Sequence, residues 1–250
     1  MIFALLCVGC SESDTGKSAR NDATPATPAA VSVTKGASDG TAIELTPSPE
    51  GFPLGLSVSQ GFALNLFETP SPSQGFKKFP AETGSKRYFD EFTIAGNKHL
   101  VITEESSPPR FYFDENHNGD LTDDRPPSEG EKAASLLPNF YSILIRYDEE
   151  KVVAPYRLWV FGSNMGGVRF YPACHWVGIL TVNGTGYQVV AFDGNCDGDY
   201  SNDPVVIDVN HNGKAEDDEK LTAGASITIE GQQVKLLSMS RSGLTVRFKL

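Results

Sequence analysis

The chain has 250 residues, of which 39% are hydrophobic, so it is long enough to bury a core in one or two domains. Its formal net charge is -11, and three short segments (114–124, 193–203 and 208–219) hold more negative charge than the whole chain carries. Such concentrated negative charge repels the phosphates of nucleic acids and attracts cations. The composition therefore excludes a nucleic-acid partner and favours a metal ion.

The first nine residues form an apolar run, MIFALLCVG, that ends in a small residue before Cys10. This pattern resembles the end of a bacterial lipoprotein signal peptide, in which the cysteine is lipidated after cleavage. The resemblance implies an exported protein, located in the periplasm or at the outer membrane or cell surface. Membrane contact is expected only through a lipid on Cys10, because the run is too short to span a bilayer.

Residues 11–42 are predicted to be a disordered linker, since 22 of these 32 residues are Ser, Thr, Ala, Pro or Gly. Such a segment buries too little apolar surface to offset the entropy lost on ordering. Only one aromatic residue, Phe3, precedes Phe52, so the folded region is expected to span residues 43–250. Two subdomains, at about 43–150 and 151–250, are an open alternative.

The folded region is predicted to be mainly β, with short antiparallel strands and hairpins in a sandwich-like or meander arrangement. The expected strands are 100–103, 111–113, 141–146, 156–161, 168–171, 176–182, 187–192, 205–207, 227–229, 234–239 and 244–250. The one helix-like stretch is Glu131–Leu137, which Pro138 ends. A weak repeat, Thr-x-x-Gly at 93–96, 181–184 and 228–231, predicts three tight hairpin turns, because glycine supplies the positive φ that they need.

Three acidic loops align without gaps, and we number their positions from the first aspartate. Loop one is DENHNGDLTDD (114–124), loop two is DGNCDGDYSND (193–203) and loop three is DVNHNGKAEDDE (208–219). Side chains with oxygen stand at positions 1, 3 and 5, glycine stands at position 6, and acids return near the end. Calcium takes six to eight oxygen ligands, and a tight loop can turn alternate side chains toward one ion. The pattern therefore predicts up to three Ca²⁺ ions.

These loops resemble the calcium loops of EF-hand and dockerin proteins, and the resemblance covers the loops alone. It implies that position 7 binds through its main-chain carbonyl and that a late acid closes the shell. The candidate ligands are Asp114, Asn116, Asn118, Asp120 and Asp124 in loop one; Asp193, Asn195, Asp197, Asp199 and Asp203 in loop two; and Asp208, Asn210, Asn212, Lys214 and Glu219 in loop three. Only loop three has its acid at position 12, so Asp124 and Asp203 at position 11 are expected to close the other two.

The residues that flank the loops predict strands and not helices, so the loops are expected to fasten a β scaffold. A sensor needs paired helices that open. The alternative is that Asp, Asn and Gly simply form turns here. Loop three matches the full pattern, loop two has the most regular acids, and loop one is the weakest.

Cys174 and Cys196 can form one disulfide in an oxidising compartment, or they can be two unrelated buried thiols. Cys174-His175 is a poor catalytic pair, because adjacent residues of a strand point to opposite faces. The sequence therefore predicts an exported calcium-binding protein that serves as a surface binding or structural module and is not an enzyme. The alternative is an extracellular carbohydrate-active enzyme with structural calcium. The sequence does not identify a protein or glycan partner.

Overall fold

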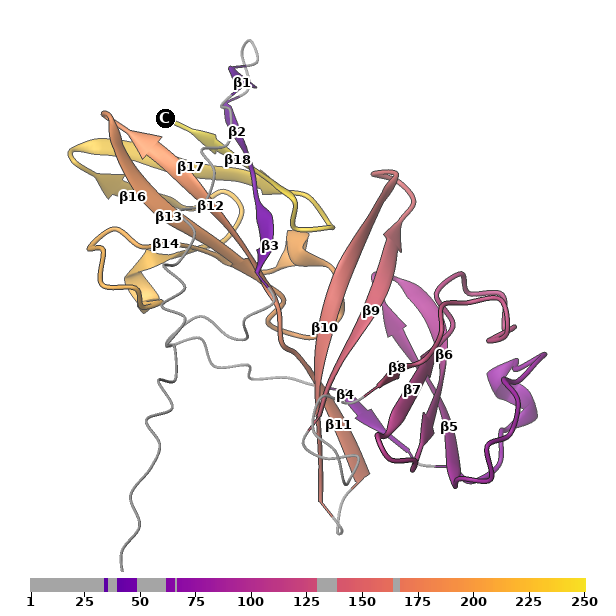
Figure 1. Ribbon diagram of the computed structural model, residues 1–250. Coiled ribbons are helices and arrows are strands. Elements are labelled where there is room, and N and C mark those ends of the chain that lie inside the picture. The colour runs from indigo at the N-terminus through magenta and orange to yellow at the C-terminus, as the bar shows by residue number, and fades with distance from the viewer. Residues whose placement is uncertain (1–33, 36–39, 49–61, 66, 130–138, 164–166) are drawn as a thin grey trace, which may run out of the picture. The chain divides into compact units, whose positions relative to one another are not determined.

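The computed structural model describes residues 34–35, 40–48, 62–65, 67–129, 139–163 and 167–250 (Figure 1). Cys10 with its apolar run, most of the predicted linker and the helix expected at Glu131–Leu137 lie outside these ranges. Within the described part the protein is mainly β, as predicted, and the named strands all pair antiparallel. None of the described helices has the length and apolar character needed to cross a membrane.

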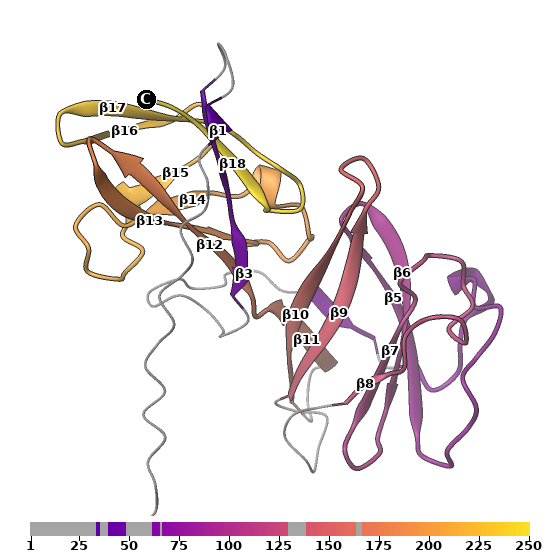
Figure 2. The same cartoon turned by 45° about the horizontal axis from the view of Figure 1, so that its top comes forward.

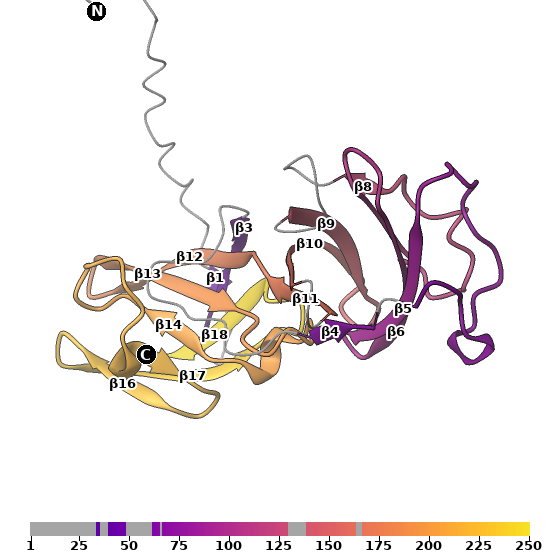
Figure 3. The same cartoon turned by 90° about the horizontal axis from the view of Figure 1, so that it is seen from below.

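Sheets A and B contain the C-terminal half of the chain together with the first strands. Sheet A has the order β1 (Thr34–Lys35), β2 (Thr41–Glu44), β18 (Thr245–Lys249), β17 (Gln232–Met239) and β16 (Ser226–Ile229). Sheet B has the order β15 (Lys220–Leu221), β14 (Val205–Ile207), β13 (Thr185–Phe192), β12 (His175–Val182) and β3 (Thr46–Ser48). The two sheets lie side by side in all three views (Figures 1, 2 and 3).

Sheets C and D contain the middle of the chain. Sheet C has the order β4 (Phe62–Leu64), β11 (Gly167–Pro172), β10 (Val152–Ser163) and β9 (Asn139–Tyr147). Sheet D has the order β5 (Arg87–Ile94), β6 (Asn97–Glu104), β7 (Arg110–Phe113) and β8 (Ser128–Glu129). Three short 3₁₀ turns complete the described elements: η1 (Pro72–Gln74), η2 (Tyr200–Asn202) and η3 (Asp217–Glu219).

Alternation of buried and exposed residues explains why these segments form strands. In β17, Val234 and Leu236 point into the core, and a bulge between Leu236 and Ser238 then brings Met239 inward as well. Every strand expected from the sequence is present, and its ends differ from the predicted ones by a few residues at most. Strand β5 and the short strands β1 to β4, β8 and β15 are absent from the predicted set. The short strands were missed because isolated segments of two to four residues show no period of their own.

The three hairpin turns predicted from the Thr-x-x-Gly repeat are confirmed. Each is a two-residue turn with both φ angles positive: Ala95–Gly96 (51° and 79°), Asn183–Gly184 (50° and 89°) and Glu230–Gly231 (48° and 79°). Two positive φ angles in a two-residue turn suit the right-handed twist of the strands that it joins.

Strands lie close to the predicted domain boundaries. Strand β1 begins at Thr34 and β2 at Thr41, both within the segment 11–42 predicted as a linker; β2 pairs with β18, and β1 pairs with β2. A division near residue 150 would cut the β9–β10 hairpin at its turn. Residues 31–250 instead form one compact unit.

One large apolar cluster draws residues from all four sheets, including Ile94 of β5, Tyr156 of β10, Trp176 of β12 and Phe248 of β18. The tertiary packing of this core sets the ends of the strands from which the acidic loops start. Loop one leaves β7, loop two joins β13 to β14, and loop three joins β14 to β15.

Candidate metal centre

The three acidic loops share one backbone conformation. Position 4 is left-handed although it is not glycine, at His117 (φ 60°), Cys196 (62°) and His211 (58°). Position 6 is a left-handed glycine in each loop, at Gly119 (φ 80°), Gly198 (74°) and Gly213 (71°). A non-glycine residue rarely adopts a positive φ. Its recurrence at the same position of three loops therefore shows that the gapless alignment of the sequences is also an alignment of the backbones.

The aspartate at position 1 organises each loop by accepting the backbone N–H groups of positions 5 and 6. These bonds are 3.1 and 3.0 Å at Asp114, 3.3 and 2.7 Å at Asp193, and 3.0 and 3.0 Å at Asp208. The oxygens at position 3 (Asn116, Asn195 and Asn210) accept the N–H of position 5, and those at position 5 (Asn118, Asp197 and Asn212) accept the N–H of position 7. Alternate side chains therefore turn inward.

The late acid of each loop lies against its beginning. The N–H of position 2 donates to Asp124 in loop one (3.0 Å), to Asp203 in loop two (3.1 Å) and to Glu219 in loop three (2.8 Å). These are the residues expected to close the loops, at positions 11, 11 and 12. The side chains at position 7 turn to other partners, since Asp120 pairs with Lys78 and Asp199 pairs with Arg241. The side chains at position 7 of loops one and two are therefore held in ion pairs.

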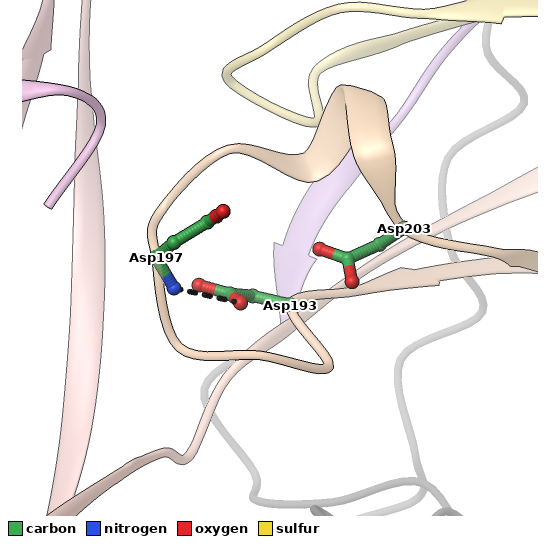
Figure 4. A group of neighbouring side chains, drawn as sticks. All are labelled: Asp193, Asp197 and Asp203. Atoms are coloured by element: carbon green, nitrogen blue, oxygen red, sulfur yellow. Dashed lines mark hydrogen bonds between the residues drawn. The ribbon is translucent and has the colours of Figure 1, made fainter. Parts of the chain in front are cut away.

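Loop two is where the described carboxylates converge most closely. Asp193, Asp197 and Asp203 each offer an oxygen, and these oxygens all lie within 4.8 Å of one another. Figure 4 shows Asp193 at the end of β13, Asp203 just before β14, and Asp197 between them at the bend of the loop. This buried acidic triad could hold a metal ion.

In loop two the guanidinium of Arg241 pairs with Asp199, whereas burial dominates the electrostatics of Asp203. Asp203 is 8% exposed, and its Oδ2 atom has no hydrogen-bond partner within the described residues. Burial, followed by the nearby charge of Asp193, raises the pKa of Asp203 to about 7. Burial also raises the pKa of Asp193. A buried carboxylate oxygen without a donor costs free energy unless a cation or proton meets it.

Loop one has a weaker arrangement of the same kind. The Oδ2 atom of Asp124 is also buried without a partner, and burial raises the pKa of this carboxyl to about 6. Two lysines lie on the loop, however: Lys77 donates to the carbonyl of Asn118 at 2.6 Å, and Lys78 pairs with Asp120. Their ammonium groups supply positive charge that would compete with a bound cation.

Loop three matches the ligand pattern best in sequence, but its late acid is already satisfied. One oxygen of Glu219 accepts two backbone N–H groups, and the other accepts that of Glu216 at 3.5 Å. Glu216 in turn accepts the side-chain amides of Asn210 and Asn212. The described residues contain no close carboxylate group in loop three comparable to the triad of loop two.

The two cysteines of the folded region are buried thiols that no disulfide joins. The sequence left open a disulfide or two buried thiols, and the structure has two buried thiols. Cys174 lies 3.8 Å from the hydroxyl of Tyr200, and Cys196 lies 3.8 Å from the hydroxyl of Tyr156. Burial raises the pKa of Cys174 to about 11, so this thiol stays protonated and is a poor nucleophile.

Several residues around loop two carried no signal in the sequence. The hydroxyl of Tyr156 donates to Asp193, that of Tyr147 donates to the carbonyl of Gly198, and the N–H of Ala95 donates to the carbonyl of Asp197 at 2.5 Å. Each comes from 37 to 102 residues earlier in the chain than its partner. Only tertiary packing brings such residues together, so no local motif could have identified them.

Comparison with protein-family models, with curated proteins and with solved structures found no match to this chain. The function is therefore argued from the geometry of the site.

The acidic triad predicts an unusual pH dependence for the protein in excess chelator. Because the folded-state pKa of Asp203 lies near 7 and above its ordinary value of 3.8, the folded state binds more protons than the unfolded state between these values. The contribution of Asp203 to stability therefore falls as the pH rises from 5 to 8. Asp203→Asn should remove this loss and stabilise the chelated protein at pH 8 by about 1–2 kcal/mol, because solvent screens part of the repulsion. Urea denaturation at several pH values measures it.

The matched control is Asp218→Asn, which neutralises an exposed carboxylate in loop three. It should leave the pH profile of the chelated protein close to that of the parent. If Asp203→Asn and Asp218→Asn gave the same profile, the charge of Asp203 would not be destabilising.

Proposed function

We propose that this protein binds calcium ions and that loop two is its principal site. The observation that carries the proposal is the triad of Asp193, Asp197 and Asp203, with the partnerless oxygen of the buried Asp203 beside it. Three carboxylates in one buried site repel each other, and a divalent cation would relieve that repulsion.

The chemistry of the loop favours calcium over magnesium. Loop two can supply oxygens from Asp193, Asn195, Asp197 and Asp203 and from the main-chain carbonyl of position 7. Calcium accepts this many protein oxygens in flexible geometry, whereas magnesium demands a near-ideal octahedron and retains several waters. Zinc prefers nitrogen and sulfur ligands, and the triad consists of three aspartates, so zinc is also disfavoured.

Loops one and three are proposed as weaker calcium sites with the same backbone. In loop one two ammonium groups, those of Lys77 and Lys78, oppose a cation, where loop two has the guanidinium of Arg241. In loop three both oxygens of the late acid, Glu219, have donors, whereas one oxygen of Asp203 in loop two has none among the described residues. The order of affinity is then loop two first, although only loop three carries an acid at position 12.

The biological setting follows from the sequence and belongs to the proposal. The apolar run before Cys10 supports export, with lipid attachment at Cys10, to a compartment where calcium is present at high concentration. We expect dissociation constants on the order of 10⁻⁴ to 10⁻³ M, as in extracellular modules. The protein acts as a surface binding or structural module whose β scaffold calcium stabilises, because the loops join paired strands and lack helices that could open.

Calcium titration tests the proposal. Isothermal titration calorimetry should show uptake of calcium at submillimolar to millimolar concentration, with a smaller response to magnesium at equal concentration. At 100 times the dissociation constant, calcium should stabilise the folded protein by about 2.7 kcal/mol, and the melting temperature should rise by roughly 5–10 °C over that in chelator. The absence of heat at millimolar calcium, together with an unchanged melting temperature, would refute calcium binding.

A further inference from the structure

The aspartate at position 1 of loop two is buried more deeply and held by more donors than a loop alone can provide. Asp193 is 1% exposed. Its Oδ1 atom accepts the N–H groups of Cys196 at 2.6 Å and Asp197 at 3.3 Å. Its Oδ2 atom accepts the N–H of Gly198 at 2.7 Å and also the hydroxyl of Tyr156 at 2.5 Å. The last bond is the only one of the four that comes from outside the loop.

The other two loops have no equivalent of this tyrosine in the part of the chain that the structure describes. The carboxylates of Asp114 and Asp208 accept only the N–H groups of positions 5 and 6 of their own loops. The three loops share a backbone, so the hydroxyl of Tyr156 is a feature specific to loop two.

A second tyrosine holds the bend of loop two. The hydroxyl of Tyr147 donates to the carbonyl of Gly198 at 2.8 Å. The carbonyl of residue 198 and the N–H of residue 199 belong to one planar peptide unit and point in opposite directions. With the carbonyl bonded to Tyr147, the N–H of Asp199 faces into the loop and donates to Asp197 at 2.7 Å, as the N–H of position 7 does in the other two loops.

Both tyrosines belong to the β9–β10 hairpin, and both are buried, at 5% exposure for Tyr147 and 1% for Tyr156. Burial raises the pKa of each phenol above its ordinary value. Each hydroxyl thus keeps its proton near neutral pH and can donate.

We propose that Tyr156 and Tyr147 are positioning residues of the loop-two calcium site, in which the β9–β10 hairpin fixes the orientation of the carboxylate at position 1 and of the peptide at position 6. This inference rests on the proposed function. The hydroxyl of Tyr156 stabilises an ionised carboxylate in the core, and its bond to Oδ2 restricts the rotation of the Asp193 side chain. The ligands of loop two then need to move less when a cation binds than those of loops one and three.

The expected size of the effect follows from partners of metal ligands in general. Loss of such a partner commonly lowers metal affinity about 10- to 100-fold. Tyr156→Phe should therefore weaken calcium binding at loop two by about this factor. Tyr147→Phe acts through a neutral backbone carbonyl, and its effect should be in the same direction and smaller. Neither change should alter the affinity of loop one or loop three.

The chain offers a matched control in the same hairpin. Tyr141 of β9 is also 1% exposed, but its hydroxyl has no hydrogen-bond partner among the described residues. Tyr141→Phe removes the same atom from the same core without touching loop two. It should leave the calcium affinity unchanged.

The experiment measures calcium affinity by calorimetry in the full chain. Asp114→Ala and Asp208→Ala are introduced together to silence loops one and three. In this background Tyr156→Phe should raise the dissociation constant about 10- to 100-fold, and Tyr141→Phe should not change it. A reciprocal chain with Asp193→Ala keeps loops one and three, and there Tyr156→Phe should have no effect on calcium affinity. If Tyr156→Phe does not fold, Tyr147→Phe is compared with Tyr141→Phe in the same way.

The outcomes separate the two proposals. An unchanged dissociation constant in Tyr156→Phe, or an equal change in Tyr141→Phe, overturns the positioning role while calcium binding stands. A lower melting temperature in chelator with the same gain on adding calcium also overturns it, because that pattern is purely structural. If the parent background with intact loop two takes up no calcium, the proposed function itself fails at that site.

Discussion

Asp193→Ala should abolish most of the stabilisation that calcium gives to this protein. Asp193 is the deepest member of the loop-two triad, and its carboxylate organises the loop through the backbone of Cys196 and Gly198. At saturating calcium the gain in the free energy of unfolding should fall by about 2–3 kcal/mol, which is the contribution expected from one site occupied at about 100 times its dissociation constant. The measurement is urea denaturation with calcium and with chelator.

The measured effect is the difference between the free energies of unfolding with calcium and with chelator. Without metal, Asp193→Ala leaves buried donors unpaired, each at a cost of about 1–3 kcal/mol, and this loss is the same on both sides of the comparison. Asp208→Ala is the matched variant at position 1 of loop three. Because loop three lacks the close carboxylates of loop two, Asp208→Ala should keep more than half of the calcium-dependent gain. If the two variants lost equal amounts, loop two would not be the principal site.

Gly198→Ala should destabilise the protein strongly even in chelator, and Gly213→Ala should not. Both glycines stand at position 6 with a left-handed φ, so each substitution costs roughly 1 kcal/mol from backbone conformation. A Cβ atom at Gly198 would lie 2.5 Å from a side-chain carbon of Ile94 and 2.9 Å from the N atom of Ala95. At Gly213 it would meet nothing within 4 Å. The overpacking at Gly198 should add about 1–3 kcal/mol.

Equilibrium denaturation of both variants in chelator measures this difference without any contribution from metal. Equal destabilisation of the two variants would contradict the packing of loop two against the β5–β6 turn. A larger effect at Gly198 would support that packing, in which the N–H of Ala95 donates to the carbonyl of Asp197.

Much of the fold was predictable because it depends on local patterns. The alternation of apolar residues predicted strands such as β13 and β17, and the turn residues predicted the hairpins at Ala95–Gly96, Asn183–Gly184 and Glu230–Gly231. The spacing of Asp, Asn and Gly in the acidic loops determined which side chains turn inward, since position 6 needs a left-handed residue and alternate oxygens follow from that bend. In each case the information lies within about twelve residues.

The burial of the late acids and the donors that they meet were not predictable in this way. Loop three carries the complete pattern, yet its Glu219 is satisfied by the backbone, while in loop two Asp203 is buried with one oxygen lacking a partner. Burial of a carboxylate depends on what packs over it. For loop two those neighbours lie on β9, β10 and the β5–β6 turn.

The sequence by itself thus determined the class of fold and the positions of three loops with a shared ligand pattern. The sequence also names Asp193, Asp197 and Asp203 as candidate ligands of loop two. Only the tertiary structure decided that one oxygen of Asp203 is buried without a partner among the described residues, and that Tyr156 donates to Asp193 from 37 residues away. The physical reason is that ligand spacing is a property of a short segment, whereas burial, charge repulsion and the donors behind a carboxylate come from residues that meet only when the sheets pack together.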